Sequence, residues 1–526
     1  MAEAALIDGT PQWTQQGKAQ GLDPLGMQNT SITLYQSLIP GISNVTLRMR
    51  YYGLHSWLIH EYAKRHHSTD EAQWRRFVRR GEALFALVCW HHTQEPGVAG
   101  NRWAARRLKQ HQGSKPLEFA LYTDQQSGQG QYLKQKFGAF GAAYASQLQV
   151  VGLIQEAKGH DVPIVVDAGK QGMAQTFGAA VGAAGKGFLR AIDKGSVTLA
   201  ELRRTGAMVP SRIDDDSSER RLYENLLFVP GLKGSAPALR RRDTLRLILH
   251  TARQLRCLPS ADDVRWAAYS GYDRAGKALP ALGGADAEHR YRWRVYHAND
   301  LMHVCHESLL RYLLEVLAET PGGIPVSSLL ATVIERLLAG LEHRPATWAD
   351  LENSVAIPAN AWGEEAESEA SLCGELLRPK ATQALTATRA YLGLRLFAVL
   401  GKRLRPERER MASVLVPPIV HVTSQTVLSE PAFLDTRRDL PIERALTEFI
   451  RQRVIDRHLA VALQKMRAGE YTFLFEIDEG RMRWRAPAAA VLTNPRLRSA
   501  ISFLRDIHLL DDNGITAAGR KILAKA

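Results

Sequence analysis

Apolar residues recur at intervals of three and four along most of the chain, which is the period of an amphipathic α-helix. The period is clear over residues 31–67, 71–92, 217–227, 239–255, 291–317, 325–341 and 381–400. Asp70 precedes the second of these segments, and Ser43 with Asn44 lies inside the first, so we expect these residues to cap helices. The pattern therefore predicts a mainly α fold.

Two segments interrupt the helical period. In residues 137–180 a helix is followed by a polar turn, a run of strand-forming residues at 162–166 and a new helix that starts near Asp167. In residues 495–526 an amphipathic stretch is followed by a tight turn at 511–514 and a last helix. Both segments predict a helix, a small hairpin and another helix.

The second segment resembles the closing half of a winged-helix domain. In many bacterial members of that class a recognition helix ends in two leucines, a small wing follows, and the next turn carries the pattern Ile-Thr-x-x-Gly-Arg. The matching residues are Leu509, Leu510, Ile515, Thr516, Gly519 and Arg520. A strand-like stretch at 471–477 stands where the class has further helices. The resemblance implies a fold that often binds DNA and also serves widely in protein interactions.

The chain of 526 residues is too long for one hydrophobic core, so several domains are expected. We expect a helical N-terminal domain (1–125), a winged-helix-like module (126–195), a helical middle domain (196–400) and a basic C-terminal domain that ends in the winged-helix-like segment (401–526). The expected architecture is mainly α and multi-domain, with one or two small α/β modules.

The chain carries 68 lysines and arginines against 54 aspartates and glutamates, a formal charge of +14. Such an excess favours an anionic partner, of which nucleic acid is the commonest. The basic residues cluster at 102–107, 240–242, 402–410 and 481–485, and such clusters displace counterions from a phosphate backbone. The alternative is that arginine-rich chains from GC-rich genomes are often basic for no specific reason.

We expect phosphate contacts from two of these clusters and from the helix that resembles a recognition helix. The residues are Arg403, Arg405, Arg408, Arg481, Arg483, Arg485, Arg498 and Arg505. Because winged-helix proteins place this helix in the groove of a duplex, DNA is favoured over RNA as the partner.

The cysteines and the apolar runs indicate the compartment. The four cysteines lie far apart without a CxxC pair, which fits reduced thiols rather than a disulfide scaffold or a zinc ribbon. The first residues lack a secretion signal, and no apolar run is long enough to span a membrane. We therefore expect a cytoplasmic protein without a membrane partner.

Cys89 is expected to be a core residue, and the small residues at 178–187 are expected to allow close helix packing.

One segment offers residues that could carry chemistry, namely His297, Asp300, His303, His306 and Glu307. At helical spacing Asp300, His303 and Glu307 share one narrow sector, which could hold a divalent metal. That sector lies opposite an apolar face, so the favoured interpretation is a solvated polar face with no metal or other cofactor.

Arg292 and His297 are similar in spacing to the Arg-x4-His motif of HEPN ribonucleases, where the two residues meet at a dimer cleft. Trp293 departs from the polar residue that usually follows the arginine in that class. A nuclease centred on residues 292–307, HEPN-like or metal-dependent, is therefore one alternative function.

The favoured function is a nucleic-acid-binding component without chemistry of its own. Residues 23–58 are similar to uncharacterised proteins encoded in bacterial genome-defence neighbourhoods. This similarity implies an accessory subunit of an antiviral system that works with other protein subunits. A protein-interaction scaffold that makes no DNA contact is the remaining alternative.

Overall fold

The computed structural model describes residues 23–111, 115–125, 128, 130–166, 172–229, 235–339, 341–378, 383–416 and 424–524. The fold is mainly helical, as predicted. The chain forms two compact units, each built from two separate stretches of sequence. Unit 1 takes its described residues from 1–31 and 298–492, and unit 2 from 32–297 and 493–526. The sequence-based boundaries at 125, 195 and 400 fall inside these units, and the finer division into four domains stays a prediction.

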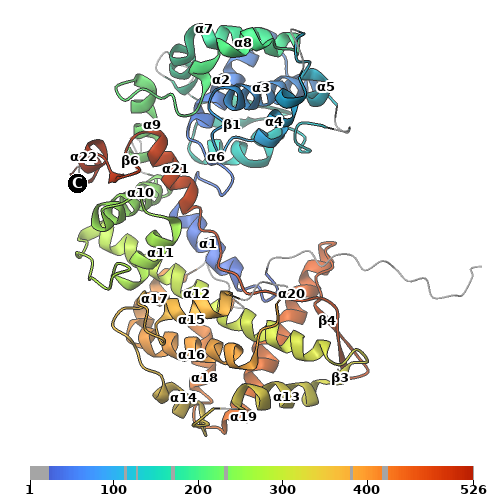
Figure 1. Ribbon diagram of the computed structural model, residues 1–526, viewed down its shortest axis with the longest axis vertical. Helices are drawn as coiled ribbons and strands as arrows, with labels where there is room; N and C mark the ends of the chain where they lie inside the picture. The colour runs from blue at the N-terminus through green and yellow to red at the C-terminus, as the bar shows by residue number, and fades with distance from the viewer. Residues whose placement is uncertain are drawn as a thin grey trace, which may run out of the picture. The chain divides into compact units, whose positions relative to one another are not determined.

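Unit 2 consists of helices with two small hairpins (Figure 1). Its elements are α1 (Gln28–Leu38, from residue 32), α2 (Arg50–His66), α3 (Glu71–His92), α4 (Asn101–Gln110), α5 (Ala120–Thr123), the π-helix η1 (Phe140–Tyr144), α6 (Ala145–Val150), β1 (Ile154–Ala157), β2 (His160–Val165), α7 (Met173–Lys194), α8 (Leu199–Arg203), the 3-10 turn η2 (Gly206–Met208), α9 (Ser218–Phe228), α10 (Ala236–Leu255), α11 (Ala261–Ser270), the first part of α12 (Gly284–Ala318), α21 (Leu497–Asp506), β6 (Leu510–Asp511), β7 (Gly514–Ile515) and α22 (Ala517–Ala524).

Two helix starts were predicted from capping residues. One is capped locally as predicted, and the other depends on a contact with a distant part of the chain. Asp70 caps α3 as expected, because its side chain accepts a hydrogen bond from the Gln73 amide (2.6 Å). The Ser43–Asn44 prediction was wrong, since α2 begins at Arg50. The Met49 amide donates instead to the Asp506 carboxylate (2.8 Å), 457 residues away.

Both predicted helix–hairpin–helix segments are present in unit 2. The antiparallel pair β1–β2 lies between α6 and α7, and the antiparallel pair β6–β7 lies between α21 and α22. The predicted helix start near Asp167 lies outside the described residues, and α7 is described from Met173. The close packing expected at 178–187 is confirmed at Gly178 and Gly185, where an added Cβ would lie 3.1 and 3.3 Å from the Trp57 indole, but not at Gly182 or Gly187, where it would have nothing within 4 Å.

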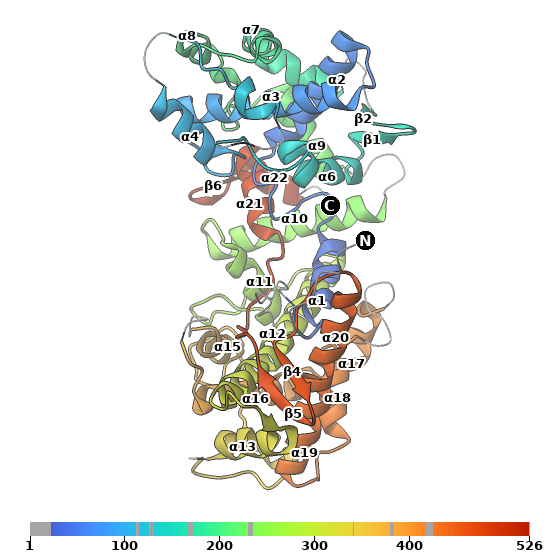
Figure 2. The same cartoon turned by 90° about the vertical axis from the view of Figure 1, so that its right-hand side faces the viewer.

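Unit 1 packs helices around α12, with one three-stranded antiparallel sheet in the order β3-β5-β4. Its elements are the rest of α12, β3 (Ile324–Pro325), α13 (Val326–Leu338), α14 (Trp348–Ser354), α15 (Glu369–Leu377), α16 (Ala387–Leu404), the 3-10 turn η3 (Arg405–Glu407), α17 (Arg408–Val414), α18 (Ser429–Asp435), α19 (Ile442–Phe449), the π-helix η4 (Ile450–Ile455), α20 (Asp456–Arg467), β4 (Phe475–Asp478) and β5 (Arg481–Trp484). Figure 2 shows β4 and β5 as a hairpin in this unit.

The start of the described chain belongs to unit 1 because side chains of α20 bind its backbone. Arg457 donates to the Leu25 carbonyl (2.8 Å), and the His458 ring lies 2.9 Å from the Pro24 carbonyl. The His458 ring accepts in turn from the Leu474 amide (3.0 Å), which fixes its neutral tautomer. Burial accordingly lowers the pKa of His458 to about 4.

Helix α12 is 35 residues long, and every side chain from 295 to 314 is buried. A helix that is covered on all sides must find partners for each of its polar groups within the protein. Among the described residues, no helix is both long and apolar enough to cross a lipid bilayer.

Candidate functional site

The C-terminal helix α21 presents a narrow basic face. Leu497, Phe503 and Leu504 are buried in unit 2, and Phe503 meets Tyr52 edge to face at 5.3 Å between ring centroids. Arg498 and Arg505 are exposed and Ser502 is half-buried between them. The spacing of four and three residues places these side chains on one side of the helix.

Two glycines let the segment after α21 pack closely, and the second of them, Gly519, is the glycine of the Ile-Thr-x-x-Gly-Arg pattern. Gly514 has φ +106°, and a Cβ there would lie 2.8 Å from the Cys257 carbonyl oxygen. A Cβ at Gly519 would lie 2.4 Å from the Leu509 carbonyl oxygen. The hairpin and α22 therefore pack at distances that only glycine permits.

The tip of the β6–β7 hairpin is acidic, which a DNA-binding wing would not favour. Asp511, Asp512 and Asn513 are exposed, and Asp512 binds Arg505 (2.6 Å). The hairpin tip is therefore a poor contact for phosphate, whereas α21 of the same module carries exposed arginines.

A groove of about 320 Å³ lies beside α21. Its lining includes Arg498, Ser502 and Arg505 of α21 and Glu95 and Gly97 of the loop before α4. Arg48, which is 8% exposed, binds two carboxylates of the groove, Glu95 and Asp506. Burial lowers the pKa of Arg48, but the two carboxylates outweigh this effect and raise it above its ordinary value. Both acidic groups of the groove are thus paired with Arg48, one guanidinium against two carboxylates.

The arginines of cluster 402–410 are held in ion pairs within unit 1. Arg403 binds the fully buried Glu369 and the Pro358 carbonyl (2.6 Å). Arg405 reaches Glu352 (2.8 Å) and Asp435 (3.0 Å), and Arg408 also binds Asp435. A phosphate would have to displace these carboxylates, so the structure gives these arginines a structural role.

The arginines of cluster 481–485 face acidic residues across a strand pair. In the register of β4 and β5, Glu476 is opposite Arg483 and Asp478 is opposite Arg481. Arg483 lies 3.4 Å from Asp478, and Arg485 binds Glu476. Cross-strand pairs of opposite charge stabilise a hairpin and reduce the net charge of its surface. The sequence places four charges in β4 and β5 that largely cancel.

The polar residues of α12 are buried, so the expectation of a solvated polar face was wrong. Asp300, His303 and Glu307 are at most 1% exposed. His303 lies between the two carboxylates, with Nδ1 3.2 Å from Asp300 and Nε2 3.8 Å from Glu307. The apolar residues of α12 define one buried face correctly, but the opposite face is covered by other parts of unit 1.

The side chains of His303 and Glu307 bind the backbone of one distant residue, Val491. His303 Nε2 lies 2.5 Å from the Val491 carbonyl oxygen, and the Val491 amide donates to Glu307 (3.1 Å). The second Glu307 oxygen accepts from the Gln28 amide group (2.6 Å). An imidazolium and a carboxylate therefore satisfy both polar groups of one peptide residue.

A second buried pair, His306 and Glu430, joins α12 to α18. The His306 nitrogens lie 2.9 Å from the Met302 carbonyl and 3.0 Å from the Glu430 carboxylate. Since both neighbours are acceptors, the ring suits a protonated state that donates from both nitrogens. Glu430 also accepts from Gln425 (3.2 Å) and from the Ser429 hydroxyl (2.9 Å).

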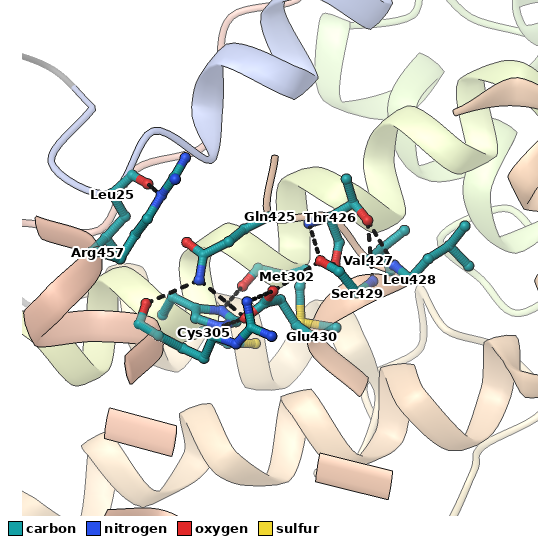
Figure 3. Close-up of polar contacts among 12 residues, drawn as sticks. Leu25, Met302, Cys305, Gln425, Thr426, Val427, Leu428, Ser429, Glu430 and Arg457 are labelled. Carbon is teal, nitrogen blue, oxygen red and sulfur yellow. Dashed lines mark hydrogen bonds and ion pairs between the residues drawn. The ribbon is translucent and has the colours of Figure 1, made fainter. Parts of the chain in front are cut away.

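The loop before α18 completes this polar network (Figure 3). The Thr426 and Ser429 side chains each accept a hydrogen bond from the other residue's amide, at 3.2 and 2.8 Å. The Val427 amide donates to Asn299 of α12 (3.0 Å), which in turn donates to Ser31 (3.0 Å). These bonds satisfy buried groups and thereby fix α18 and the start of the chain against α12.

The α12 cluster does not form a metal centre. Within the part of the chain that the structure describes, no group of three or more His, Cys, Asp and Glu side chains could hold a metal ion. Burial lowers the pKa of His303, but the carboxylates of Glu307 and Asp300 raise it to about 9. A protonated imidazole has no lone pair for a metal, so His303 acts as the cation of the cluster itself.

The Arg292–His297 pair does not form an open cleft. His297 is fully buried, with its ring centroid 4.4 Å from that of Trp266 and 5.3 Å from that of Tyr269. An RNA phosphate must approach a catalytic imidazole closely, and these aromatic rings occupy the space around it. Cys89 is likewise buried, as expected from the sequence.

Unit 2 contains a buried pair that sequence reasoning missed, Glu82 and His55, both fully buried and 3.6 Å apart. Glu82 accepts from the amides of Ala139 (2.8 Å) and Phe140 (2.5 Å), where the π-helix η1 begins. Burial raises the pKa of Glu82 to about 8 and lowers that of His55 to about 3. Glu82 lies in an otherwise apolar stretch of α3, and this was the available signal.

No protein-family model, curated protein or solved structure matches this chain. The case for a function therefore rests on the chain's own residues and their arrangement.

Proposed function

We propose that this chain is a nucleic-acid-binding component of a bacterial multi-protein system, with duplex DNA as its preferred partner and no active site of its own. The resemblance of residues 23–58 to genome-defence proteins is the reason for proposing antiviral defence as the role of that system. Other protein subunits would then supply the chemistry.

The observation that carries the proposal is the solvent face of α21. Its most exposed side chains are Arg498 and Arg505, with Ser502 between them, and all three can donate hydrogen bonds to phosphates or base edges. No carboxylate among the described residues forms an ion pair with Arg498. Within the described part of the chain, Arg505 pairs with Asp512 alone, whose side chain is 85% exposed, and such surface pairs contribute little stability. This face is therefore available to a phosphate backbone.

The test is binding of a labelled DNA duplex to the full chain between about 50 and 200 mM salt. We expect wild-type affinity to fall steeply with salt, and Arg498→Glu to weaken binding and reduce the salt slope by about one. Arg444→Glu is the matched control, because Arg444 is a surface arginine of α19 with 68% side-chain exposure and the same change of charge.

Two outcomes would overturn the proposal. Binding that is absent or insensitive to salt would favour a protein-interaction scaffold. Equal effects of Arg498→Glu and Arg444→Glu would show that α21 does not contact the nucleic acid. Single-stranded DNA and RNA of the same length, measured in parallel, establish which nucleic acid is preferred.

A further inference from the structure

Helix α4 carries a second basic face in unit 2. Arg102, Arg106 and Lys109 are exposed, and their spacing of four and three residues puts them on one side of the helix. No ion pair joins any of the three to a carboxylate among the described residues. This distinguishes α4 from clusters 402–410 and 481–485, whose arginines mostly bind carboxylates.

The other side of α4 is anchored, so the basic face is held outward. Trp103 is 4% exposed, and its indole donates to the Gly130 carbonyl (2.8 Å). The guanidinium of Arg107 lies over the Tyr122 ring, 4.3 Å from the centroid. The basic side chains on the exposed face are left without a structural task.

The chain connects this face directly to the groove beside α21. Glu95 and Gly97 line the same groove as Arg498 and Ser502, and the loop that holds them continues into α4. Asn101 at the helix start donates to the Glu95 carbonyl (2.5 Å), which fixes the junction. In Figure 2, α4 and the hairpin next to α21 lie toward the left-hand side of unit 2.

We propose that α4 is the second wall of the nucleic-acid interface, and that Arg102, Arg106 and Lys109 bind backbone phosphates of the duplex contacted by α21. This inference rests on the proposed function. At 1.5 Å per residue the three charges span about 10 Å along the helix, which is the axial length of about three phosphates of one strand at 3.4 Å each. Because phosphate contacts carry no sequence information, α4 contributes affinity and not sequence preference.

The experiment compares three charge-reversed forms of the full chain in the duplex binding assay. The α4 form carries Arg102→Glu, Arg106→Glu and Lys109→Glu, and the α21 form carries Arg498→Glu and Arg505→Glu. The control form carries Lys186→Glu, Arg190→Glu and Lys194→Glu on α7, which are exposed basic residues of the same unit.

We expect the α4 form to lose at least about tenfold in affinity. The slope of log affinity against log salt should become shallower by about 2.7, since each phosphate contact accounts for about 0.9. The α7 control should keep the wild-type slope. Replacement by glutamine instead of glutamate at the three α4 positions should give a smaller loss in the same direction. Thermal unfolding of each form shows whether the helix has stayed folded.

The inference is overturned if the α4 and α7 forms bind alike while the α21 form loses affinity, and the proposed function then stands. Loss in the α4 form alone would support α4 as a phosphate-binding wall and remove α21 from the interface. A wild-type chain that binds no duplex would overturn both proposals.

Discussion

At the scale of single residues, the charge on His303 depends on two carboxylates that share its buried site. Burial lowers the pKa of His303, but Glu307 and Asp300 outweigh it and raise the pKa from 6.5 to about 9. Burial raises the pKa of Glu307 from 4.5 to about 7, against the lowering effect of His303. Both side chains keep their proton up to a higher pH in the folded state than in the unfolded state. Folding is therefore linked to proton uptake at this site.

This linkage predicts how stability depends on pH. The contribution of Glu307 is fully present below about pH 4.5 and is lost as pH rises through 7, and that of His303 is present below about 6.5 and lost through 9. We expect the thermal unfolding midpoint of unit 1 to fall between about pH 6 and pH 9. A midpoint that rises over this range would show that the site does not bind protons on folding.

The substitution His303→Gln isolates the role of the imidazolium. It removes the cation between Asp300 and Glu307 while keeping a donor for the Val491 carbonyl, and loss of one partner of a buried pair costs about 3–5 kcal/mol. Its loss of stability should be larger at pH 5, where the contribution of His303 is fully present, than at pH 8, where that contribution is being lost. Thermal unfolding of wild type and variant at the two values measures the difference.

The sequence indicates which residues form this site but not its environment. Helical periodicity places Asp300, His303 and Glu307 in one sector, and the structure confirms that they adjoin. Their partners Gln28 and Val491 lie 279 and 184 residues from Glu307. A local pattern contains no information about groups that approach from so far along the chain, so a buried network and a solvated face have the same periodicity.

At the scale of elements, the C-terminal hairpin depends on a close approach at Gly519. An alanine there would bring Cβ to 2.4 Å from the Leu509 carbonyl oxygen and 2.8 Å from Ile515. Because the first of these neighbours is backbone, we expect Gly519→Ala to destabilise the hairpin and α22 by about 1–3 kcal/mol. Faster amide hydrogen exchange in residues 509–524 would report the loss.

Gly187→Ala is the matched control for this substitution. Gly187 also lies in a helix of unit 2, but a Cβ there would have nothing within 4 Å. Alanine should therefore stabilise α7 by roughly 0.5–1 kcal/mol through its helix propensity. If both glycines tolerate alanine equally, the close packing of α22 against Leu509 is not needed for the hairpin.

Elements with a local cause were the most predictable. Asp70 caps α3 through its own side chain, and the hairpin at 511–514 follows from its turn residues, so both were found from the sequence. The start of α2 was missed because Asp506, and not Ser43 or Asn44, accepts the first amide. The acidic neighbours of cluster 481–485 were not foreseen, because the strand register that sets Arg483 opposite Glu476 and Arg481 opposite Asp478 is not visible locally.

At the scale of the whole molecule, the two units each combine separate parts of the chain. Unit 1 joins the segment before Ile32 to residues 298–492, and unit 2 is completed by the residues from 493 onward. Sequence-based division cuts a chain at successive points, and it cannot show that a late segment returns to an early one. The same long-range pairing decides which basic residues are available to a ligand.

The net charge of +14 therefore overstates the surface that can bind a polyanion. Arg102, Arg106, Lys109, Arg498 and Arg505 are the basic residues of the proposed interface, so we expect about five phosphate contacts and a slope of log affinity against log salt of about −4.5. A slope near −9 would mean that the arginines of clusters 402–410 and 481–485 leave their carboxylates to bind DNA. The substitution Glu352→Gln, which disrupts the pair between Arg405 and Glu352, distinguishes the two cases. It should leave the slope unchanged if those arginines only stabilise the fold. It should make the slope steeper if they bind DNA.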